Sequence, residues 1–231
     1  MLQRLSRSDT HLRFAVLATD TALFTLCKGE LMVRLVKVNR PPHYKGVWGL
    51  PGGLIRPEET AEETSIRILE EKGGIPASKA YIEQLYTFSA LRRDPRGRVV
   101  AVAYLALVPW EDLSAQEKAD TDEVCWRRVQ GAHGLAYDHD DILSVARARL
   151  RSRATYTTVL SKVMPSEFTL TELEKAYEAV LKTDLDKRNF RKKILKVGIL
   201  KDLGRKRISG HSRPAALYRF ASPTVRHIEV I

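Results

Sequence analysis

Residues 40–75 constrain the fold more than any other part of the chain. The stretch RPPHYKGVWGLPGG, residues 40–53, is too rich in Pro and Gly for a regular element, so we expect an ordered loop there. Apolar residues at helical spacing predict a helix over residues 60–72, and Gly73 with Gly74 ends it. The chain therefore has to build its first half around one ordered loop and one helix.

Extended segments flank this loop and helix on both sides. Residues 22–26 and 31–38 predict two strands, joined by a tight turn at residues 28–30. Residues 80–90 and 99–108 predict two more, on either side of the charged turn RRDPRGR. Strand, strand, loop and helix, strand, strand is the order of a mixed sheet with helical cover, and we expect an α+β fold.

The second half has a different pattern. Residues 138–153 place apolar side chains on one face and arginines on the other, which predicts a helix that bridges two bodies. Three further helical segments and a closing hairpin are expected, over residues 156–164, 168–181, 187–200 and 201–220. Thr169 and Glu172 have the spacing of a capping box.

Charge is distributed very unevenly between the two halves. Residues 1–150 hold 21 Lys/Arg and 20 Asp/Glu, whereas residues 151–231 hold 18 and 8, so almost all of the net charge of +11 lies in the last third. A solvated surface could carry such an excess, but a folded segment this basic more often meets a polyanion.

The cysteines, the histidines and the hydropathy indicate a soluble cytoplasmic protein without a metal site, and we expect no cofactor. Cys27 and Cys125 lie in apolar surroundings, as buried thiols in a reducing compartment do. The apolar run over residues 14–27 is short and interrupted by Asp20, so we expect neither a membrane span nor a signal peptide. The six histidines show no paired metal spacing, and we expect none to be a metal ligand.

Residues 53–75 resemble the Nudix box: Gly, five residues, Glu, seven residues, then Arg-Glu-aliphatic-x-Glu-Glu-x-Gly-aliphatic. The matching positions are Gly53, Glu59, Arg67, Leu69, Glu71, Gly74 and Ile75. Hydrolases of that family hold Mg²⁺ or Mn²⁺ with three glutamates, and the corresponding residues here are Ile68, Glu71 and Lys72. Shifting the alignment by one residue does not restore the set.

This departure predicts that the chain is not an enzyme. The three positions share one helix face, so in a working enzyme their carboxylates converge. Ile68 offers no ligand atom, and an ammonium within about 5 Å of a divalent ion opposes it by several kcal/mol at an effective dielectric of about 20. Glu71 is the one position of the three that keeps a glutamate, and it could simply form a salt bridge with Arg67 on the helix surface.

A cleft that has lost its chemistry can still bind a nucleotide. Guanidinium groups suit diphosphates and an aromatic ring, Trp48 or Tyr44, can stack on a base. The expected ligand-binding residues are Arg40, Trp48, Gly52, Gly53, Arg67, Glu71, Arg96 and Arg98.

The basic segment 155–220 resembles a winged helix, in which the last helix enters the major groove and the hairpin follows the backbone. Phe190, Ile194 and Leu195 are expected to anchor that helix. The expected DNA-binding residues are Lys187, Arg188, Asn189, Arg191, Lys192 and Lys193 on the helix, and Arg205, Lys206, Arg207, His211 and Arg213 on the hairpin. A generic RNA-binding surface is the alternative, but the aromatic residues lie in apolar patterns, which favours double-stranded DNA.

A Nudix-like domain without its catalytic acids, followed by a winged helix, is similar to the NrtR family of transcriptional regulators. The resemblance implies an N-terminal Nudix-like α/β/α sandwich with a mixed sheet and a C-terminal winged helix-turn-helix. It also implies a homodimer that binds a palindromic operator, senses ADP-ribose or a related nucleotide, and commonly represses genes of NAD metabolism. The expected parts are an effector-binding domain over residues 1–137, a bridging helix over 138–154 and a DNA-binding domain over 155–231.

Two other functions stay open at this point. The chain could be an active hydrolase of ADP-ribose-like nucleoside diphosphate derivatives that recruits a metal through Glu59, Glu70 and Glu71. It could also bind RNA and couple that binding to nucleotide sensing.

Overall fold

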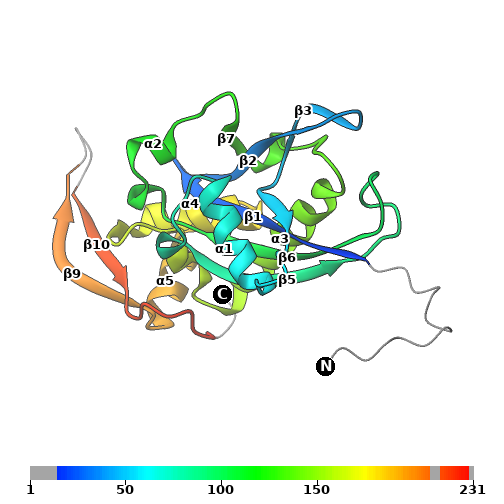
Figure 1. Cartoon of the computed structure of the whole chain (residues 1–231). Helices are drawn as coiled ribbons and strands as arrows, with labels where there is room; N and C mark the ends of the chain where they lie inside the picture. Colours follow the sequence, from blue (N-terminus) through cyan, green and yellow to red (C-terminus); the bar gives the residue numbers. More distant parts are fainter. Residues whose placement is uncertain (1–14, 209–213, 229–231) are drawn as a thin grey trace.

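The computed structural model of the chain describes residues 15–208 and 214–228 (Figure 1). A mixed sheet forms the first half, in the order β3-β2-β1-β6-β5, with β4 paired to β1 and β7 paired to β2. Its strands are β1 (Val16–Cys27), β2 (Glu30–Arg40), β3 (Tyr44–Gly49), β4 (Gly52–Leu54), β5 (Tyr81–Phe88), β6 (Val99–Leu107) and β7 (Val124–Arg128). β1 and β6 are parallel and the other pairs are antiparallel. The predicted mixed sheet is confirmed.

The predicted turn between the first two strands is also confirmed. Lys28 and Gly29 have φ values of 52° and 79°, and Cys27 faces Glu30 in the ladder. Two successive left-handed residues give a hairpin turn whose twist matches that of the strands, and Gly adopts this conformation without strain.

Helices cover both faces of the sheet. α1 (Ala61–Glu71) and α3 (His139–Tyr156) both pack against β1. Successive residues of a strand point to opposite faces. Leu23 packs in the cluster that contains Leu69 of α1, whereas Phe24 packs in the cluster of α3. The two helices therefore lie on opposite faces, as expected for an α/β/α sandwich.

Local signals define both ends of α1, and the helix predicted over residues 60–72 is confirmed. The Thr60 hydroxyl accepts from the Glu63 N–H while the Glu63 carboxylate accepts from the Thr60 N–H, which is a capping box. Gly73 and Gly74 follow the helix, and Gly74 has a φ of 68°.

The ordered loop expected over residues 40–53 is wrong, because this segment adds two strands to the sheet. β3 extends the β2 edge and β4 pairs with β1. Gly46 has a φ of 70°, and the ladder shifts register between Val38 and Asn39. A bulged edge strand tolerates the Gly-rich sequence that argued against regular structure. β7 is a further short strand that the periodicity does not predict.

The second half folds as a winged helix. Its elements are a 3₁₀ turn (Val159–Lys162), β8 (Phe168–Thr169), α4 (Leu170–Leu181), α5 (Lys187–Lys196), β9 (Leu200–Arg207) and β10 (Ala215–Phe220). β10 lies between β8 and β9, and the orange and red hairpin strands mark one edge of the molecule in Figure 1. The helix predicted over residues 168–181 is confirmed from Leu170 onward, and the predicted hairpin is confirmed. The helix predicted over 187–200 is confirmed as far as Lys196, because Gly198 has a φ of 73° and Leu200 already belongs to β9. The helix expected over 156–164 is wrong, because Thr157 pairs with His227 in an isolated bridge and only a 3₁₀ turn follows.

The helices of this half are fixed by a cap and by aromatic packing. The Thr169–Glu172 capping box starts α4, as predicted. Phe190 of α5 is buried and its ring centroid lies 5.3 Å from that of Tyr177 in α4. Leu195 is 47% exposed, so the expectation that it anchors the inner face of α5 is wrong. One residue after buried Ile194, its side chain is turned about 100° away from the core.

One hydrophobic cluster runs through both halves. It includes Phe24 and Leu105 of the sheet, Leu150 of α3, Tyr177 of α4 and Phe190 of α5. α3 contacts both the sheet and α4, and α4 also packs against β2. Within residues 15–208 and 214–228, no helix is long and apolar enough to cross a membrane.

Candidate functional site

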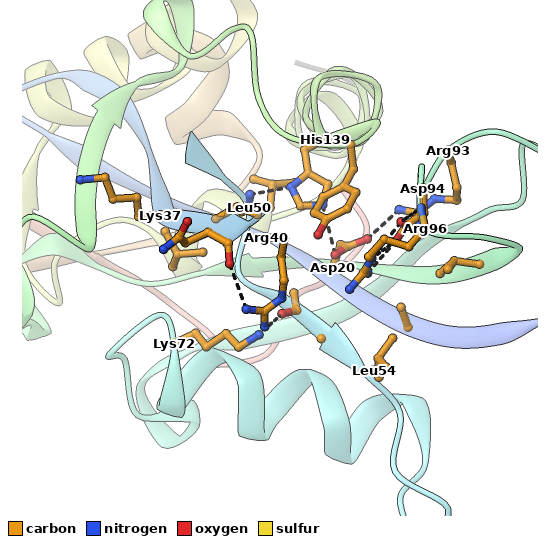
Figure 2. A pocket seen from close by; sticks show the side chains of 18 of the residues that line it. Asp20, Lys37, Arg40, Leu50, Leu54, Lys72, Arg93, Asp94, Arg96 and His139 are labelled. Carbon is orange, nitrogen blue, oxygen red and sulfur yellow. Dashed lines mark hydrogen bonds and ion pairs between the residues drawn. The ribbon is translucent and has the colours of Figure 1, made fainter. Parts of the chain in front are cut away.

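A pocket of about 400 Å³ opens beside the C-terminal end of α1 (Figure 2). Its walls come from β1, β2 and β4, from the end of α1, from the loop before β6 and from the start of α3. The side chains that matter below include Asp20, Lys37, Arg40, Lys72, Arg93, Arg96, Tyr137 and His139. A pocket of this size is at the lower end of the range for nucleotide-sized ligands.

A buried ion network forms the floor of the pocket. The Arg93 guanidinium donates to Asp20 Oδ2 at 2.8 Å and to both oxygens of Asp138 at 2.7 and 2.8 Å. His139 Nε2 lies 3.2 Å from Asp20 Oδ1, and the Leu50 N–H donates to His139 Nδ1 at 2.8 Å. Because Nδ1 accepts this bond, the hydrogen-bond partners assign the ring proton to Nε2, facing Asp20.

The network keeps Asp20 ionised in a buried position. Burial alone would raise the pKa of Asp20, but His139 and Arg93 outweigh it and hold that pKa below the ordinary value. Burial opposes the charge of Arg93 as well, yet its bonds to Asp138 and Asp20 raise its pKa. Gly52 allows this close packing, because a Cβ there would lie 2.0 Å from Asp20 Oδ1.

Cationic groups dominate the opposite wall. Lys72 Nζ donates to the Gly52 carbonyl oxygen at 2.6 Å, so the side chain points into the pocket. Burial of the ammonium and the nearby Arg40 guanidinium lower the pKa of Lys72. Lys37 also lines the pocket, but its ammonium is turned away from Lys72 (Figure 2) and lies over the Trp48 ring, 5.9 Å from the centroid. This wall therefore favours an anionic ligand.

The donor set does not fit the divalent metal that Nudix hydrolases use. Ile68 is 2% exposed and packs against Gly53, where a Cβ would approach Ile68 Cδ1 to 2.5 Å. Lys72 places a positive charge where a metal ligand would be needed. In residues 15–208 and 214–228, no three His, Cys, Asp or Glu side chains are grouped as a metal site. Hard cations require several oxygen ligands, and this helix face offers only Glu71.

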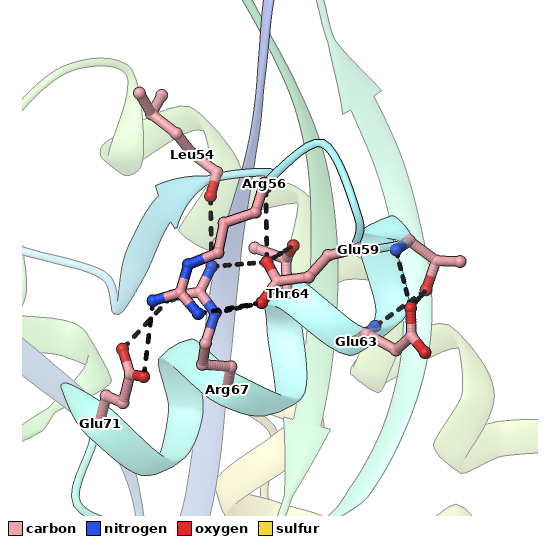
Figure 3. Close-up of polar contacts among 8 residues, drawn as sticks. Leu54, Arg56, Glu59, Glu63, Thr64, Arg67 and Glu71 are labelled. Carbon is pink, nitrogen blue, oxygen red and sulfur yellow. Dashed lines mark hydrogen bonds and ion pairs between the residues drawn. The ribbon is translucent and has the colours of Figure 1, made fainter.

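Of the alternative metal ligands, Glu59 and Glu71 meet at the Arg67 guanidinium, whereas Glu70 lies apart from them. Figure 3 shows Arg67 donating to both oxygens of Glu59, at 2.6 and 2.7 Å. These bonds lower the pKa of Glu59 to about 2. Glu70 instead accepts from the Ala77 N–H at 3.0 Å. Glu59 and Arg67 thus fasten the loop to the helix, and Arg67 also reaches Glu71 at 3.3 Å.

The structure places five of the eight predicted ligand residues in the pocket wall. These are Arg40, Gly52, Gly53, Glu71 and Arg96. The Arg96 guanidinium donates to both oxygens of buried Asp94 and lies over the Tyr137 ring, 5.5 Å from its centroid.

The other three lie outside the pocket wall, because each has a structural partner elsewhere. Arg67 is held by Glu59. Arg98 donates to the carbonyl oxygens of Ser89 and Ala90. Trp48 packs against the core, with the Arg127 guanidinium 5.2 Å from its ring centroid. The Tyr44 ring lies against that of Tyr137, at 4.6 Å between centroids, and does not line the pocket either.

Periodicity and composition do not predict the floor network. The one available signal was Asp20, a charge that interrupts an otherwise apolar run. Its partners Arg93 and His139 are 73 and 119 positions away, and nothing local marks them. Tyr137 has a φ of 57°, a conformation unusual for a non-Gly residue, at the edge of the same pocket.

The predicted DNA-binding residues of α5 form an exposed basic face. All six, namely Lys187, Arg188, Asn189, Arg191, Lys192 and Lys193, are exposed. On the hairpin, Lys206 is exposed, Arg205 pairs with Glu167, and Arg207 pairs with Glu172 at 2.8 Å. His211 and Arg213 lie outside the described residues.

Comparison with known proteins agrees with this architecture. Residues 16–146 match the family model of the NUDIX domain, and residues 160–220 match that of the NrtR DNA-binding winged helix domain. The chain is 35% identical over 210 residues to the ADPR responsive transcriptional repressor NtrR of Acinetobacter baylyi, covering 89% of this chain and 82% of that protein.

Two solved structures from Shewanella oneidensis are similar. NrtR complexed with a 27mer DNA is 36% identical, with a TM-score of 0.77 over 88% of this chain and 93% of that one. The NUDIX domain of NrtR complexed with ADP ribose is 32% identical, with a TM-score of 0.52 over 63% of this chain and 99% of that one. The expected α+β fold, a Nudix-like domain followed by a winged helix, is confirmed. This chain belongs to the NrtR family, in which a Nudix domain is joined to a DNA-binding winged helix.

Proposed function

We propose that this protein is a transcriptional repressor that binds operator DNA through its winged helix and releases it in response to ADP-ribose or a related nucleotide. The observation that carries the proposal is a cationic pocket whose metal-binding helix face holds Ile68 and Lys72. Such a pocket is suited to recognition without cleavage. The Acinetobacter relative is named for its response to ADPR, and Shewanella NrtR was solved with DNA and, as a NUDIX domain, with ADP ribose.

The pocket supplies the groups that a nucleoside diphosphate sugar needs. Arg40 and Lys72 offer N–H donors to phosphate oxygens on one wall. Arg96, already oriented by Asp94, covers the Tyr137 ring near the floor. A bound diphosphate would compensate charges that the protein leaves only partly paired, and this is the physical reason to expect affinity.

Hydrolysis is not part of the proposal, because the catalytic donor set is incomplete. Of the three helix-face positions, only Glu71 keeps a carboxylate, and this group pairs with Arg67. Glu59 is already occupied by two bonds from the same guanidinium. No rearrangement of rotamers converts Ile68 into an oxygen ligand.

The winged helix supplies the DNA contacts in this proposal. α5 presents Asn189 and Arg188 among its exposed residues, and these side chain types pair with adenine and guanine edges. Arg191 donates to Thr171 Oγ1 at 3.0 Å and has to leave that bond, or share it, to reach a phosphate. We propose that two copies of the chain form a cytoplasmic homodimer and place two α5 helices on a palindromic operator.

α3 is the element through which the ligand would act on DNA binding. Its first residue is His139, and Asp138 stands at the N-cap position with its carboxylate bonded to Arg93 rather than to the helix. The partner of Asp20 and the partner of Arg93 therefore both belong to the start of this helix. The other end of α3 leads into the winged helix, and its flank packs on α4. A ligand that shifts the floor network thereby shifts the base on which α4 and α5 rest.

The test uses the purified full chain with ADP-ribose, Mg²⁺ and DNA from upstream of its own gene. We expect calorimetric binding of ADP-ribose, no turnover at ordinary enzyme rates of about 1–10³ s⁻¹, and a gel shift of duplex DNA that ADP-ribose weakens. Rapid hydrolysis would overturn the proposal in favour of a hydrolase. Equal affinity for single-stranded RNA and duplex DNA would overturn it in favour of RNA binding.

A further inference from the structure

We infer that the Lys72 ammonium takes the place of a divalent cation in this pocket, so that a nucleotide diphosphate binds there without Mg²⁺. The inference rests on the proposed function and adds to it how the ligand is held. A lysine at a position where a Nudix hydrolase has an acid would then supply the positive charge that the metal supplies in the hydrolase.

The Lys72 ammonium lies between the C-terminal end of α1 and strand β4. Lys72 is the C-cap of α1, and its side chain reaches over β4 to the Gly52 carbonyl oxygen, 2.6 Å away. A Cβ on neighbouring Gly53 would lie 3.6 Å from the same nitrogen. A backbone carbonyl is the kind of hard oxygen that a divalent cation uses as a ligand. Here that oxygen is bonded to a cation tethered to the protein.

The Lys72 ammonium has more N–H donors than the protein uses. An ammonium has three N–H groups. In residues 15–208 and 214–228, the Gly52 carbonyl is the single acceptor that the Lys72 ammonium bonds, and the ammonium forms no ion pair there. Two N–H groups therefore remain for a ligand in the pocket.

The positive charge of Lys72 has no carboxylate partner in the described residues. Glu71 would be the natural counter-ion, but it pairs with Arg67 and Arg56 instead, at 3.3 and 3.9 Å. Burial and the Arg40 guanidinium both disfavour the charged form of Lys72 and lower its pKa. Two cations that face a shared cavity are relieved by an anion placed between them, and a diphosphate carries that charge.

Ile68 lies one turn before Lys72 on the same face of α1. Its buried side chain fills the space beside Gly53. A second cation therefore has no room next to the ammonium on this side. The pair Ile68 and Lys72 thus acts as a unit, with one side chain closing the metal position and the other supplying a fixed charge.

The competing explanation is structural: the Lys72 bond to Gly52 would only fasten α1 to β4. The two explanations differ in what metal does. A purely structural lysine leaves ligand affinity unchanged when its bond is removed without unfolding. A cation substitute makes affinity independent of metal in the natural protein and dependent on charge at position 72.

The experiment is calorimetric titration of the full chain with ADP-ribose, once in EDTA and once in Mg²⁺. We expect the same affinity in both buffers for the natural protein. Lys72→Met should weaken binding about 10- to 100-fold, the range for loss of hydrogen bonds from a charged group, and Lys72→Arg should retain most of it. Lys72→Glu should bind poorly in EDTA and equally poorly in Mg²⁺, because Ile68 still closes the metal position. Lys45→Met, an exposed lysine on β3 outside the pocket wall, is the matched control and should bind normally.

The outcomes separate the two proposals. If the natural protein binds ADP-ribose in either buffer but Lys72→Met binds equally well, the cation role is wrong and the sensing function stands. A natural protein that needs Mg²⁺ for binding also overturns the cation role. No binding of ADP-ribose in either buffer contradicts the proposed function itself. Melting temperatures of all four variants show whether a loss of affinity comes from unfolding.

Discussion

Replacing Arg93 with Met should destabilise the protein more than any other single ion-pair change in its described part. The Arg93 side chain is 3% exposed and bonds Asp20, which is 8% exposed, and Asp138, which is 12% exposed. Removing the cation leaves two carboxylates in a buried floor with only His139 beside Asp20. Breaking such a buried network costs about 3–5 kcal/mol. For a chain of this size that corresponds to about 6–20 °C in melting temperature.

The assay is urea unfolding followed by circular dichroism, with calorimetric melting as a second measurement. Arg128→Met is the matched control, because Arg128 pairs with Glu30 at the surface, where the two side chains are 69% and 41% exposed. An exposed pair contributes about 0–1 kcal/mol. The reasoning is refuted if Arg93→Met and Arg128→Met lower the free energy of unfolding by the same amount. Adding Asp20→Asn to Arg93→Met should recover part of the loss, since it removes one uncompensated charge.

The same network predicts an acid transition. The pKa of Asp20 is lower in the folded than in the unfolded chain, because His139 and Arg93 favour its ionised form. Its stabilising contribution is therefore fully present above the unfolded pKa of about 4 and is lost as the pH falls through the folded value. Arg93→Met removes one of these two causes. Between about pH 5 and about pH 3, the free energy of unfolding should therefore fall less in the variant than in the natural protein.

Three further changes test the pocket, a helix cap and the DNA surface. Gly52→Ala should reduce ADP-ribose affinity at least about tenfold in calorimetry, because its Cβ would lie 2.0 Å from Asp20 Oδ1 and the floor must shift; normal affinity would contradict this packing. Thr169→Ala should lower the free energy of unfolding by about 1 kcal/mol in urea, through loss of the α4 cap, and no measurable loss would show the cap to be dispensable. Lys192→Ala should reduce the slope of log affinity against log salt by about 1 in gel shifts, and an unchanged slope would remove Lys192 from the phosphate contacts.

Elements with local signals were predictable from the sequence. α1 has its capping box at Thr60 and its glycines at the end, and α4 has the same box at Thr169. These signals act within one turn of the chain, so periodicity and capping are sufficient to find them. β3 and β7 have no such signal. They are strands because β2 offers an edge on each side, and such pairing depends on residues far away in sequence.

The candidate site also has a part that was predictable from local sequence and a part that was not. The Nudix-like helix and its substitutions at Ile68 and Lys72 were visible because their spacing is local. The floor network was not, since each contact joins residues at least 45 positions apart, as Arg93 and Asp138 are. Asp20 looked like an interruption of an apolar run, yet it is buried and paired. His139 accepts a bond from the Leu50 N–H, and that bond could not be foreseen from the sequence.

Packing, rather than a flexible linker, joins the pocket to the DNA surface. His139 starts α3 in the pocket floor, Leu150 of α3 shares a cluster with Tyr177 of α4, and Tyr177 contacts Phe190 of α5. Close-packed interiors do not deform continuously, so a displaced α3 has to carry α4 with it or lose contacts. If ADP-ribose weakens operator binding as proposed, the coupling is reciprocal: operator DNA must weaken ADP-ribose binding by the same factor, typically about 5- to 150-fold. Equal ADP-ribose affinity in the presence and absence of operator would show that the pocket and α5 are not coupled, however continuous the core between them is.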